Sequence, residues 1–109
     1  MSRCSAWWAR AGVRTVVFGL MLAVSALAGC GPGLYLSALR PAARAIERAQ
    51  AAGAEEHAPY DYYFALAHLD KAREEAAESA FQDAADHARV AREHAERAEA
   101  SCRSVEGSP

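Results

Sequence analysis

Cysteine and histidine side chains have the widest chemical scope in this sequence, and the cysteines lie far apart. They are Cys4, Cys30 and Cys102. A thiolate can act as a nucleophile, bind a metal ion or form a disulfide. No Cys-X-X-Cys pair is present, so a dithiol redox site is not expected. Cys102 is a candidate for an intermolecular disulfide in an oxidising compartment, and a small buried apolar side chain is the alternative interpretation.

Two histidines near the end of the chain share one face of a predicted helix. His87 and His94 are seven residues apart, and Asp83 lies one helical turn before His87. The three side chains could form a weak metal site, but zinc sites need three or four convergent ligands and no further ligand is evident. We favour a solvated polar face and expect neither a metal ion nor another cofactor.

The composition argues against an enzyme and against a nucleic-acid-binding protein. The sequence offers no Ser-His-Asp arrangement, phosphate-binding glycine loop or paired carboxylate site, so no enzymatic activity is expected. From Cys30 onward, 22 of 80 residues are alanine, which favours helices but provides only a thin core. The same residues include nine Lys or Arg and fourteen Asp or Glu, a net charge of −5 that disfavours binding to nucleic acid.

The first 29 residues have the pattern of an export signal. Arg3, Arg10 and Arg14 precede an apolar stretch over residues 16–28, and no acidic residue occurs in this region. An uncleaved transmembrane helix is the less favoured alternative, because an apolar stretch of about 13 residues falls short of the roughly 20 that span a bilayer.

The apolar stretch ends in Leu27, Ala28, Gly29 and Cys30, which resembles the lipobox of bacterial lipoproteins. The resemblance implies that the signal peptidase recognises Leu27, Ala28 and Gly29 and cleaves before Cys30. It also implies a diacylglyceryl group on the Cys30 thiol and acylation, as with palmitate, of the new amino terminus. Two or more acyl chains hold a protein stably in a membrane. Many inner-membrane lipoproteins have Asp after the cysteine, so Gly31 favours the outer membrane, with the protein facing the periplasm.

The remaining chain is predicted to be all-α. We expect a signal peptide over residues 1–29, a Gly- and Pro-containing tether over 30–35, an alanine-rich helical domain over 36–103 and a disordered tail over 104–109. A first helix is predicted from about Pro41 to Ala52, because Pro suits a first helical turn, and Gly53 ends it. An apolar face runs through this helix and the less regular residues 36–40 before it: Leu36, Leu39, Ala43, Ile46 and Ala49.

Residues 60–103 contain neither Gly nor Pro, so they form either one long helix or two. We favour two, because Ser79 and Gln82 fit a capping box that would begin a new helix. The fold predicted is a small up-and-down bundle of three helices, with a helical hairpin as the alternative. A seam of small residues is expected to pack closely on the preceding helix: Phe81, Ala84, Ala88, Ala91, Ala95, Ala98 and Cys102.

Two surface features could contact a partner. Tyr60, Tyr62, Tyr63 and Phe64 cannot all point inward on a helix, so they form a candidate partner-binding patch, with simple core capping as the alternative. A second feature, a stripe of arginines at four-residue spacing, could lie against anionic lipid head groups, although a solvated face is the favoured interpretation. The stripe consists of Arg40, Arg44 and Arg48.

Residues 36–98 resemble the alanine-rich lipoproteins of a bacterial family of unknown function. The resemblance rests on an Ala-Gly-Ala step at residues 52–54, an Ala-Pro step at residues 58–59, and the later pattern of Leu66, Leu69 and Ala72. In some relatives such a segment precedes an OmpA-like peptidoglycan-binding domain, but no wall-binding residue is expected in this chain. The resemblance implies a location in the cell envelope and implies no activity.

Together these patterns predict a lipid-anchored, non-enzymatic helical adaptor or accessory lipoprotein of an envelope assembly. Its expected partners are the membrane, through Cys30, and another protein. The alternative is a structural envelope lipoprotein, a spacer that associates with itself through the alanine seam and Cys102.

Overall fold

The computed structural model of the chain describes residues 12–22 and 30–108. The chain divides into two compact units, Met1–Cys30 and Gly31–Pro109. We call the second the helical unit. Residues 12–22 of the first unit are helical, and the lipobox residues 27–29 lie outside the described residues.

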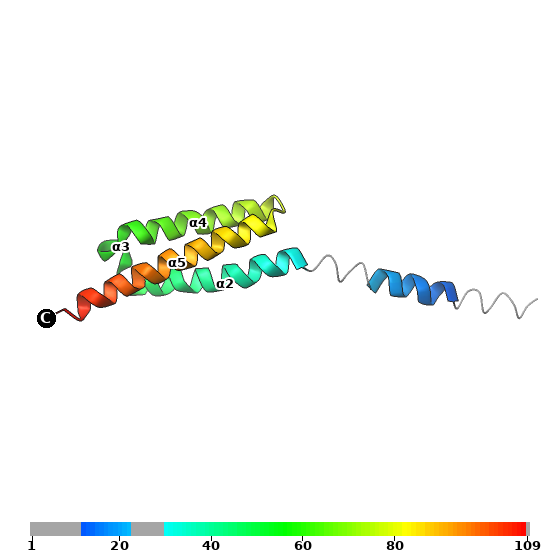
Figure 1. Cartoon of the computed structure of the whole chain (residues 1–109), viewed down its shortest axis with the longest axis horizontal. Helices are drawn as coiled ribbons and strands as arrows, with labels where there is room; N and C mark the ends of the chain where they lie inside the picture. The colour runs from blue at the N-terminus through cyan, green and yellow to red at the C-terminus, as the bar shows by residue number, and fades with distance from the viewer. Residues whose placement is uncertain (1–11, 23–29, 109) are drawn as a thin grey trace, which may run out of the picture. The chain divides into compact units, whose positions relative to one another are not determined.

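Four helices follow one another from residue 30 onward: α2 (Cys30–Ala51), α3 (Ala54–His57), α4 (Pro59–Ala77) and α5 (Phe81–Glu106). Figure 1 shows α2, α4 and α5 running alongside one another, with α4 antiparallel to the other two. No strand occurs in the described part of the chain, so the predicted all-α class is confirmed. The predicted number of three helices is wrong, because the connection after Gly53 contains the single turn α3 and residues 12–22 are also helical.

The start of α2 differs most from the prediction. Residues 30–35, expected to be a tether, form its first turns, and Pro41 lies inside the helix rather than at its start. Pro41 has no N–H group, so the carbonyl of Ser37 loses its usual helical partner. The helix continues regardless, because Ala42, Ala45 and Ala49 beyond Pro41 are fully buried and hold it against the core. The opposite end also differs: α5 extends to Glu106, so residues 104–106 of the expected tail are helical.

The ends of α2 and α4 are each followed by a residue in the left-handed region. Gly53, with φ of 78°, follows the end of α2 as predicted. Ser79, with φ of 65°, follows α4, where its N–H bonds to the Ala76 carbonyl and the N–H of Ala80 bonds to the Glu75 carbonyl. This is a Schellman motif, which ends a helix by satisfying its last carbonyls.

The predicted break near Ser79 is therefore confirmed, but its predicted cause is wrong. Ala80 is the N-cap of α5, and no side chain caps it. Ser79 ends α4 rather than beginning α5, so the capping box with Gln82 does not form.

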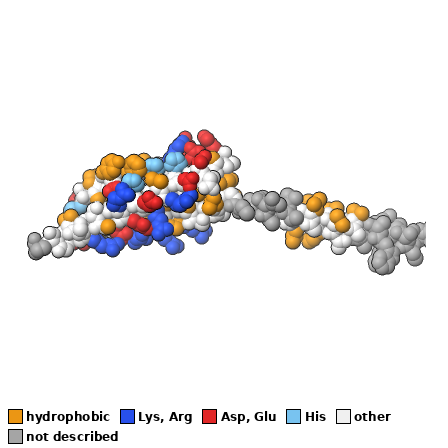
Figure 2. All heavy atoms as spheres, in the orientation of Figure 1, with side chains coloured by type: hydrophobic (Ala, Val, Ile, Leu, Met, Phe, Trp, Pro, Cys, Tyr) orange, Lys and Arg blue, Asp and Glu red, His pale blue; other side chains and the backbone are white. Residues whose placement is uncertain are grey.

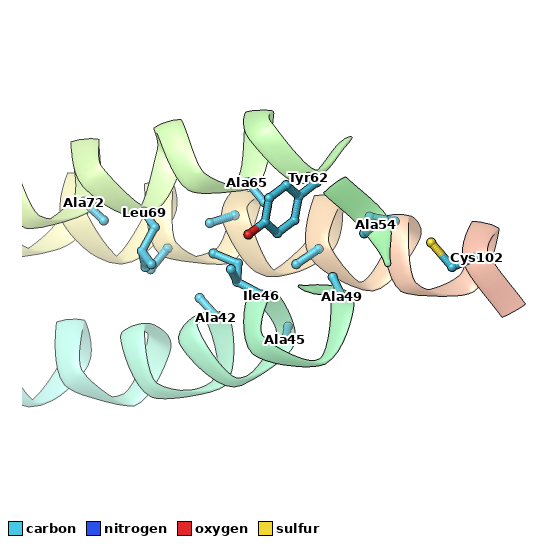
Figure 3. Close-up of a cluster of buried hydrophobic side chains, with 14 residues drawn as sticks. Ala42, Ala45, Ile46, Ala49, Ala54, Tyr62, Ala65, Leu69, Ala72 and Cys102 are labelled. Carbon is cyan, nitrogen blue, oxygen red and sulfur yellow. The ribbon is translucent and has the colours of Figure 1, made fainter. Parts of the chain in front are cut away.

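The charged side chains of the helical unit lie on its surface (Figure 2). Among the described residues, none of the polar or charged ones is buried. The core consists mainly of alanine, as Figure 3 shows for the cluster between the helices. On α5 every buried residue is alanine except Cys102: Ala84, Ala85, Ala88, Ala91, Ala95, Ala98 and Cys102. Because an alanine side chain ends at Cβ, the helix backbones must approach closely for these residues to make contact.

Ile46, Tyr62 and Leu69 provide the larger core side chains. They come from α2 and α4 and pack against the alanines of α5. The predicted close packing of the alanine seam on the preceding helix is thus confirmed. The predicted apolar face of α2 is confirmed in part: Ile46 and Ala49 are buried as expected, but Ala42 and Ala45 are buried as well, whereas Leu36 is 43% exposed.

The first turn of α2 and the first turn of α5 also touch. A Cβ atom placed on Gly31 would lie 2.8 Å from Cδ2 of Phe81, so the absence of a side chain at residue 31 permits this contact. Gly31 thus has a packing role in addition to its expected role in sorting. Phe81, expected in the seam, is only half-buried.

Replacing Ser79 with glycine is expected to stabilise the helical unit by about 0.5 to 1 kcal/mol. A left-handed conformation costs a residue with Cβ about 1 to 2 kcal/mol, and the greater freedom of glycine in the unfolded chain offsets part of that gain. The free energy of unfolding from urea titration measures the change. Ser79→Ala is the matched control, since alanine keeps Cβ and should give no gain; equal effects of the two substitutions would contradict the assignment.

Candidate functional site

The predicted lipid-attachment residue, Cys30, is the first residue of α2. Leu27, Ala28 and Gly29 are not among the described residues, so lipid attachment stays a prediction from the sequence. In residues 12–22 the large apolar side chains are exposed, with Phe18 at 73% and Met21 at 72%. Within the described ranges, no helix has the length and apolar character required to cross a membrane.

The aromatic residues at the start of α4 divide between surface and core. Tyr60 is 72% exposed and Tyr63 is 51% exposed, whereas Tyr62 is 5% exposed and belongs to the core. Phe64 is half-buried, and its ring centroid lies 5.8 Å from that of Tyr60. The predicted partner patch is thus reduced to Tyr60 and Tyr63, with Phe64 at its edge. We call these three residues the tyrosine patch.

The hydroxyl of Tyr63 donates a hydrogen bond of 2.9 Å to Oε1 of Glu55 on α3. This bond to a carboxylate raises the pKa of Tyr63 above its ordinary value. The side chain of Tyr63 is therefore oriented across the connection between α3 and α4 while its ring stays accessible.

Histidine and aspartate side chains form a row along the contact between α4 and α5. Nδ1 of His68 lies 3.0 Å from Nδ1 of His87, so one ring must donate its N–H and the other must accept. About two turns further along α5, Nδ1 of His94 donates to Oδ1 of Asp61 at 2.7 Å. The Phe64 ring lies between the two pairs, 4.5 Å from the His68 ring and 4.2 Å from the His94 ring.

Sequence reasoning placed His87 and His94 on one face but did not identify their partners. His68 and Asp61 are seven residues apart on α4, as His87 and His94 are on α5. Equal spacing on two antiparallel helices places both pairs in register. This matched spacing is the sequence feature from which the partners of His87 and His94 could have been predicted. Asp83 makes no contact in the row, and no group of three His, Cys, Asp or Glu side chains suited to a metal ion occurs in residues 12–22 and 30–108.

The row contains one histidine with a shifted pKa. Partial burial, with smaller contributions from the neighbouring His87 and His94, lowers the pKa of His68 below its ordinary value. The lowered pKa favours the neutral form of His68, which can either donate to the His87 ring or accept from it. Arg97 also donates to Asp61, at 3.4 Å, so this carboxylate is shared by two basic side chains of α5.

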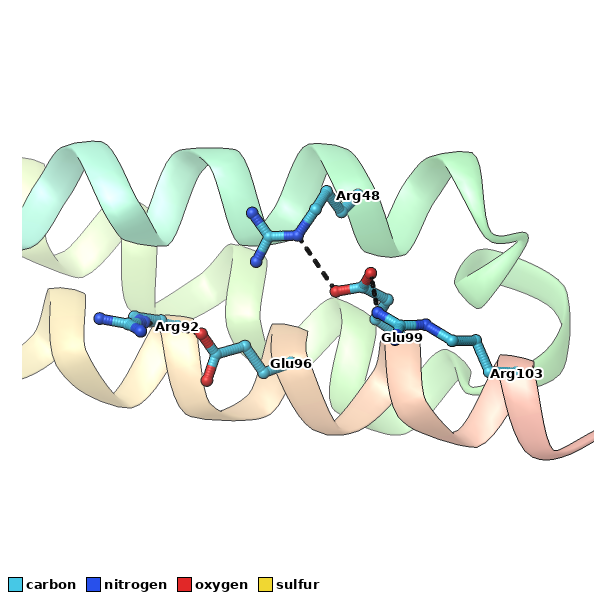
Figure 4. Close-up of polar contacts among 5 residues, drawn as sticks. All are labelled: Arg48, Arg92, Glu96, Glu99 and Arg103. Carbon is cyan, nitrogen blue, oxygen red and sulfur yellow. Dashed lines mark hydrogen bonds and ion pairs between the residues drawn. The ribbon is translucent and has the colours of Figure 1, made fainter.

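Arginine side chains gather on the opposite flank of α5, where it meets α2 (Figure 4). Arg48 of α2 donates through Nε to Oε2 of Glu99 at 3.2 Å, and Arg103 bonds to the other oxygen of Glu99. The two guanidinium groups, Arg103 first, lower the pKa of Glu99 below its ordinary value. Arg92 pairs with Glu96 at 2.7 Å on the same flank. All three arginines of the predicted stripe on α2 are exposed: Arg40, Arg44 and Arg48.

The remaining candidate, Cys102, is a free thiol with 3% of its surface exposed. It lies among the core residues at the end of the alanine seam. A disulfide to a second chain would require this end of α5 to move away from the core, so the structure fits the alternative interpretation, a small buried apolar side chain.

An all-helical unit packed through alanine, with polar rows on its flanks, defines a small helical domain. The chain belongs to the family described as Domain of unknown function (DUF4398), whose model matches residues 37–106. No curated protein and no solved structure matches the chain.

The helical unit is expected to lose stability as the pH falls below about 6.5, the ordinary pKa of histidine. The folded state holds the pKa of His68 below that value, so the unfolded state binds the proton more readily. This contribution is complete above the unfolded pKa and is lost as the pH falls. Urea unfolding at a series of pH values from 8 to 5 measures it.

His68→Gln should flatten this pH dependence. His57→Gln, at an exposed histidine outside the row, is the control and should leave the dependence unchanged. An identical pH profile for the parent and His68→Gln would show that the row does not couple proton binding to folding.

Proposed function

We propose that this protein is a lipid-anchored, non-enzymatic adaptor in the bacterial envelope, which holds the helical unit at the periplasmic side of a membrane and presents the tyrosine patch to a protein partner. Three features of the sequence support the anchor: the basic start, the apolar residues 16–28 and the lipobox ending at Cys30. The boundary between the two compact units falls directly after Cys30, one residue beyond the proposed cleavage site.

One observation carries the adaptor part of the proposal: two large aromatic side chains lie exposed on the outer side of α4. Tyrosine is enriched where proteins bind each other, because its ring contributes apolar contact area and its hydroxyl a hydrogen bond. Tyr60 has no core role, and the hydrogen bond to Glu55 orients Tyr63 without burying it.

The second candidate function, a self-associating spacer, requires the alanine seam to contact another copy of the chain. The seam alanines of α5 instead pack inside the helical unit, between α2 and α4. Cys102 is buried in the same cluster. These contacts favour the adaptor over the spacer.

Delivery to the outer membrane is part of the proposal and rests on Gly31. Because Phe81 packs against Gly31, an Asp at this position would both change the sorting signal and disturb packing. Gly31→Ala disturbs the same packing without adding a carboxylate, so a sorting comparison needs both variants.

The anchor is tested by the intact mass of the protein extracted from membranes, beside that of a Cys30→Ala variant. The parent is expected to begin at Cys30 and to carry the added mass of acyl chains, and the variant should have neither change, since it lacks the sulfur nucleophile. An unprocessed parent mass would contradict the anchor and would leave residues 16–28 attached to the helical unit.

The adaptor role is tested by crosslinking in cells, with a photoreactive phenylalanine analogue in place of Tyr60. A discrete adduct with a different protein is expected. The same analogue in place of Arg73, an exposed residue of α4 outside the patch, is the control and should give none. Adducts of the chain with itself would support the spacer, and equal crosslinking from both positions would refute a specific patch.

A further inference from the structure

A surface groove follows the contact between α2 and α5, on the flank opposite the tyrosine patch and the histidine row. It consists of a cavity of about 460 Å³ and a second of about 320 Å³. Both cavities are lined by Pro41 and Arg92, so they adjoin and form one continuous groove. Cavities of this size are in the range that small-molecule ligands occupy in proteins.

Most of the surface at the end of the groove nearer the start of α2 is apolar. Leu34, Ala38 and Pro41 of α2 line it with Ala85 of α5, and the polar side chains at its border are Ser37, Gln82, Arg89 and Arg92. Leu34 is 43% exposed. Covering these side chains would remove apolar surface from water, which favours an occupant with a hydrocarbon portion.

The other end is cationic. Arg44, Arg48 and Arg92 line it, and Glu96 is the one acidic side chain there. Arg92 binds Glu96 through Nε, and Arg48 binds Glu99 through Nε. Neither of these two hydrogen bonds uses a terminal guanidinium nitrogen. Arg44 takes part in no ion pair within the described ranges. In the view of Figure 2, Lys and Arg side chains follow the edge of the helical unit where α2 lies in Figure 1.

This arginine cluster stands out because the chain from Cys30 onward has a net charge of −5. A local excess of guanidinium groups in an acidic protein creates a site for an anion. The planar guanidinium fork matches the oxygens of a carboxylate or a phosphate.

We propose that this groove binds an anionic lipid of the membrane, with one acyl chain against the apolar end and its phosphate or carboxylate on the arginines. The apolar end of the groove lies nearer the proposed anchor at Cys30 than the cationic end does, which is the order that a membrane lipid requires. Leu34 is four residues from Cys30 along α2, about 6 Å, and Arg48 is eighteen residues from it, about 27 Å.

A lipid in the leaflet that holds Cys30 has the same polarity, with its chain toward the membrane and its head group away from it. The choice of the membrane as the source of the lipid rests on the proposed anchor. The evidence for an amphiphile with a negative charge does not rest on the anchor, because it comes from the shape and charge of the groove.

The first test uses the helical unit, residues 31–109, which contains every core residue and lacks the anchor. Dodecyl phosphate is added below its micelle concentration, and binding is measured by titration calorimetry. Saturable binding is expected, with at least tenfold weaker binding of dodecyl maltoside, which has the same chain without charge, and of inorganic phosphate, which lacks the chain. Equal affinity for dodecyl phosphate and dodecyl maltoside would overturn the proposal.

Two variants assign the binding to the groove. Arg44→Gln should weaken the binding of dodecyl phosphate about tenfold, because it removes a charge-assisted hydrogen bond from a residue with no ion pair to lose. Leu34→Ser should weaken it severalfold through the apolar end. Arg73→Gln on α4 makes the same change of charge outside the groove and should have no effect. Unchanged affinity in Arg44→Gln would place the amphiphile elsewhere.

The second test identifies the source, with vesicles of phosphatidylglycerol and of phosphatidylcholine. The helical unit is expected to float with the anionic vesicles only, and Arg44→Gln should reduce that fraction. Binding of dodecyl phosphate without binding of the anionic vesicles would overturn the assignment to a membrane lipid. Since residues 31–109 lack Cys30, failure here is distinguishable from failure of the anchor, which the intact mass reports.

Discussion

The close approach of α5 to its neighbours is the constraint on which the rest of this structure depends. The buried residues of α5 are six alanines and Cys102, so this helix contributes no long apolar side chain to the core. Contact is therefore made by bringing backbones together and by the larger Ile46, Tyr62 and Leu69 of the other two long helices. Apart from the Tyr62 hydroxyl and the Cys102 thiol, this core holds no polar side-chain group, and no charged residue is buried among those described.

Polar chemistry is consequently restricted to the two flanks of α5, and the two flanks differ. Toward α4, the His68–His87 and His94–Asp61 pairs form a partly buried row in which the pKa of His68 is lowered. Toward α2, the arginines border an open groove whose other end has mostly apolar surface. The tyrosine patch lies on α4 itself, so the partner surface and the lipid groove that we propose are on different elements and can be altered separately.

The sequence predicted those features that depend on local pattern. The helical class, the stop at Gly53 and the alanine face of α5 follow from periodicity and from residue preferences, whereas the break near Ser79 was placed correctly for a cause that is wrong. The features that depend on tertiary contact were wrong or missed. Residues 30–35 were predicted to be a tether, but they form the first turns of α2. In this segment Gly31 contacts Phe81 of α5. The partners of the histidines lie 19 and 33 residues away along the chain, beyond the reach of any pattern within one helix.

The central claim of this account is that the alanine seam is used inside a single chain, which leaves the outer side of α4 free for a partner. Sedimentation equilibrium of the helical unit, with and without a reductant, tests it most directly. The account predicts a monomer under both conditions, because the seam and Cys102 are already buried. A dimer under both conditions, or a dimer that dissociates with the reductant, would contradict it and would support the self-associating spacer instead.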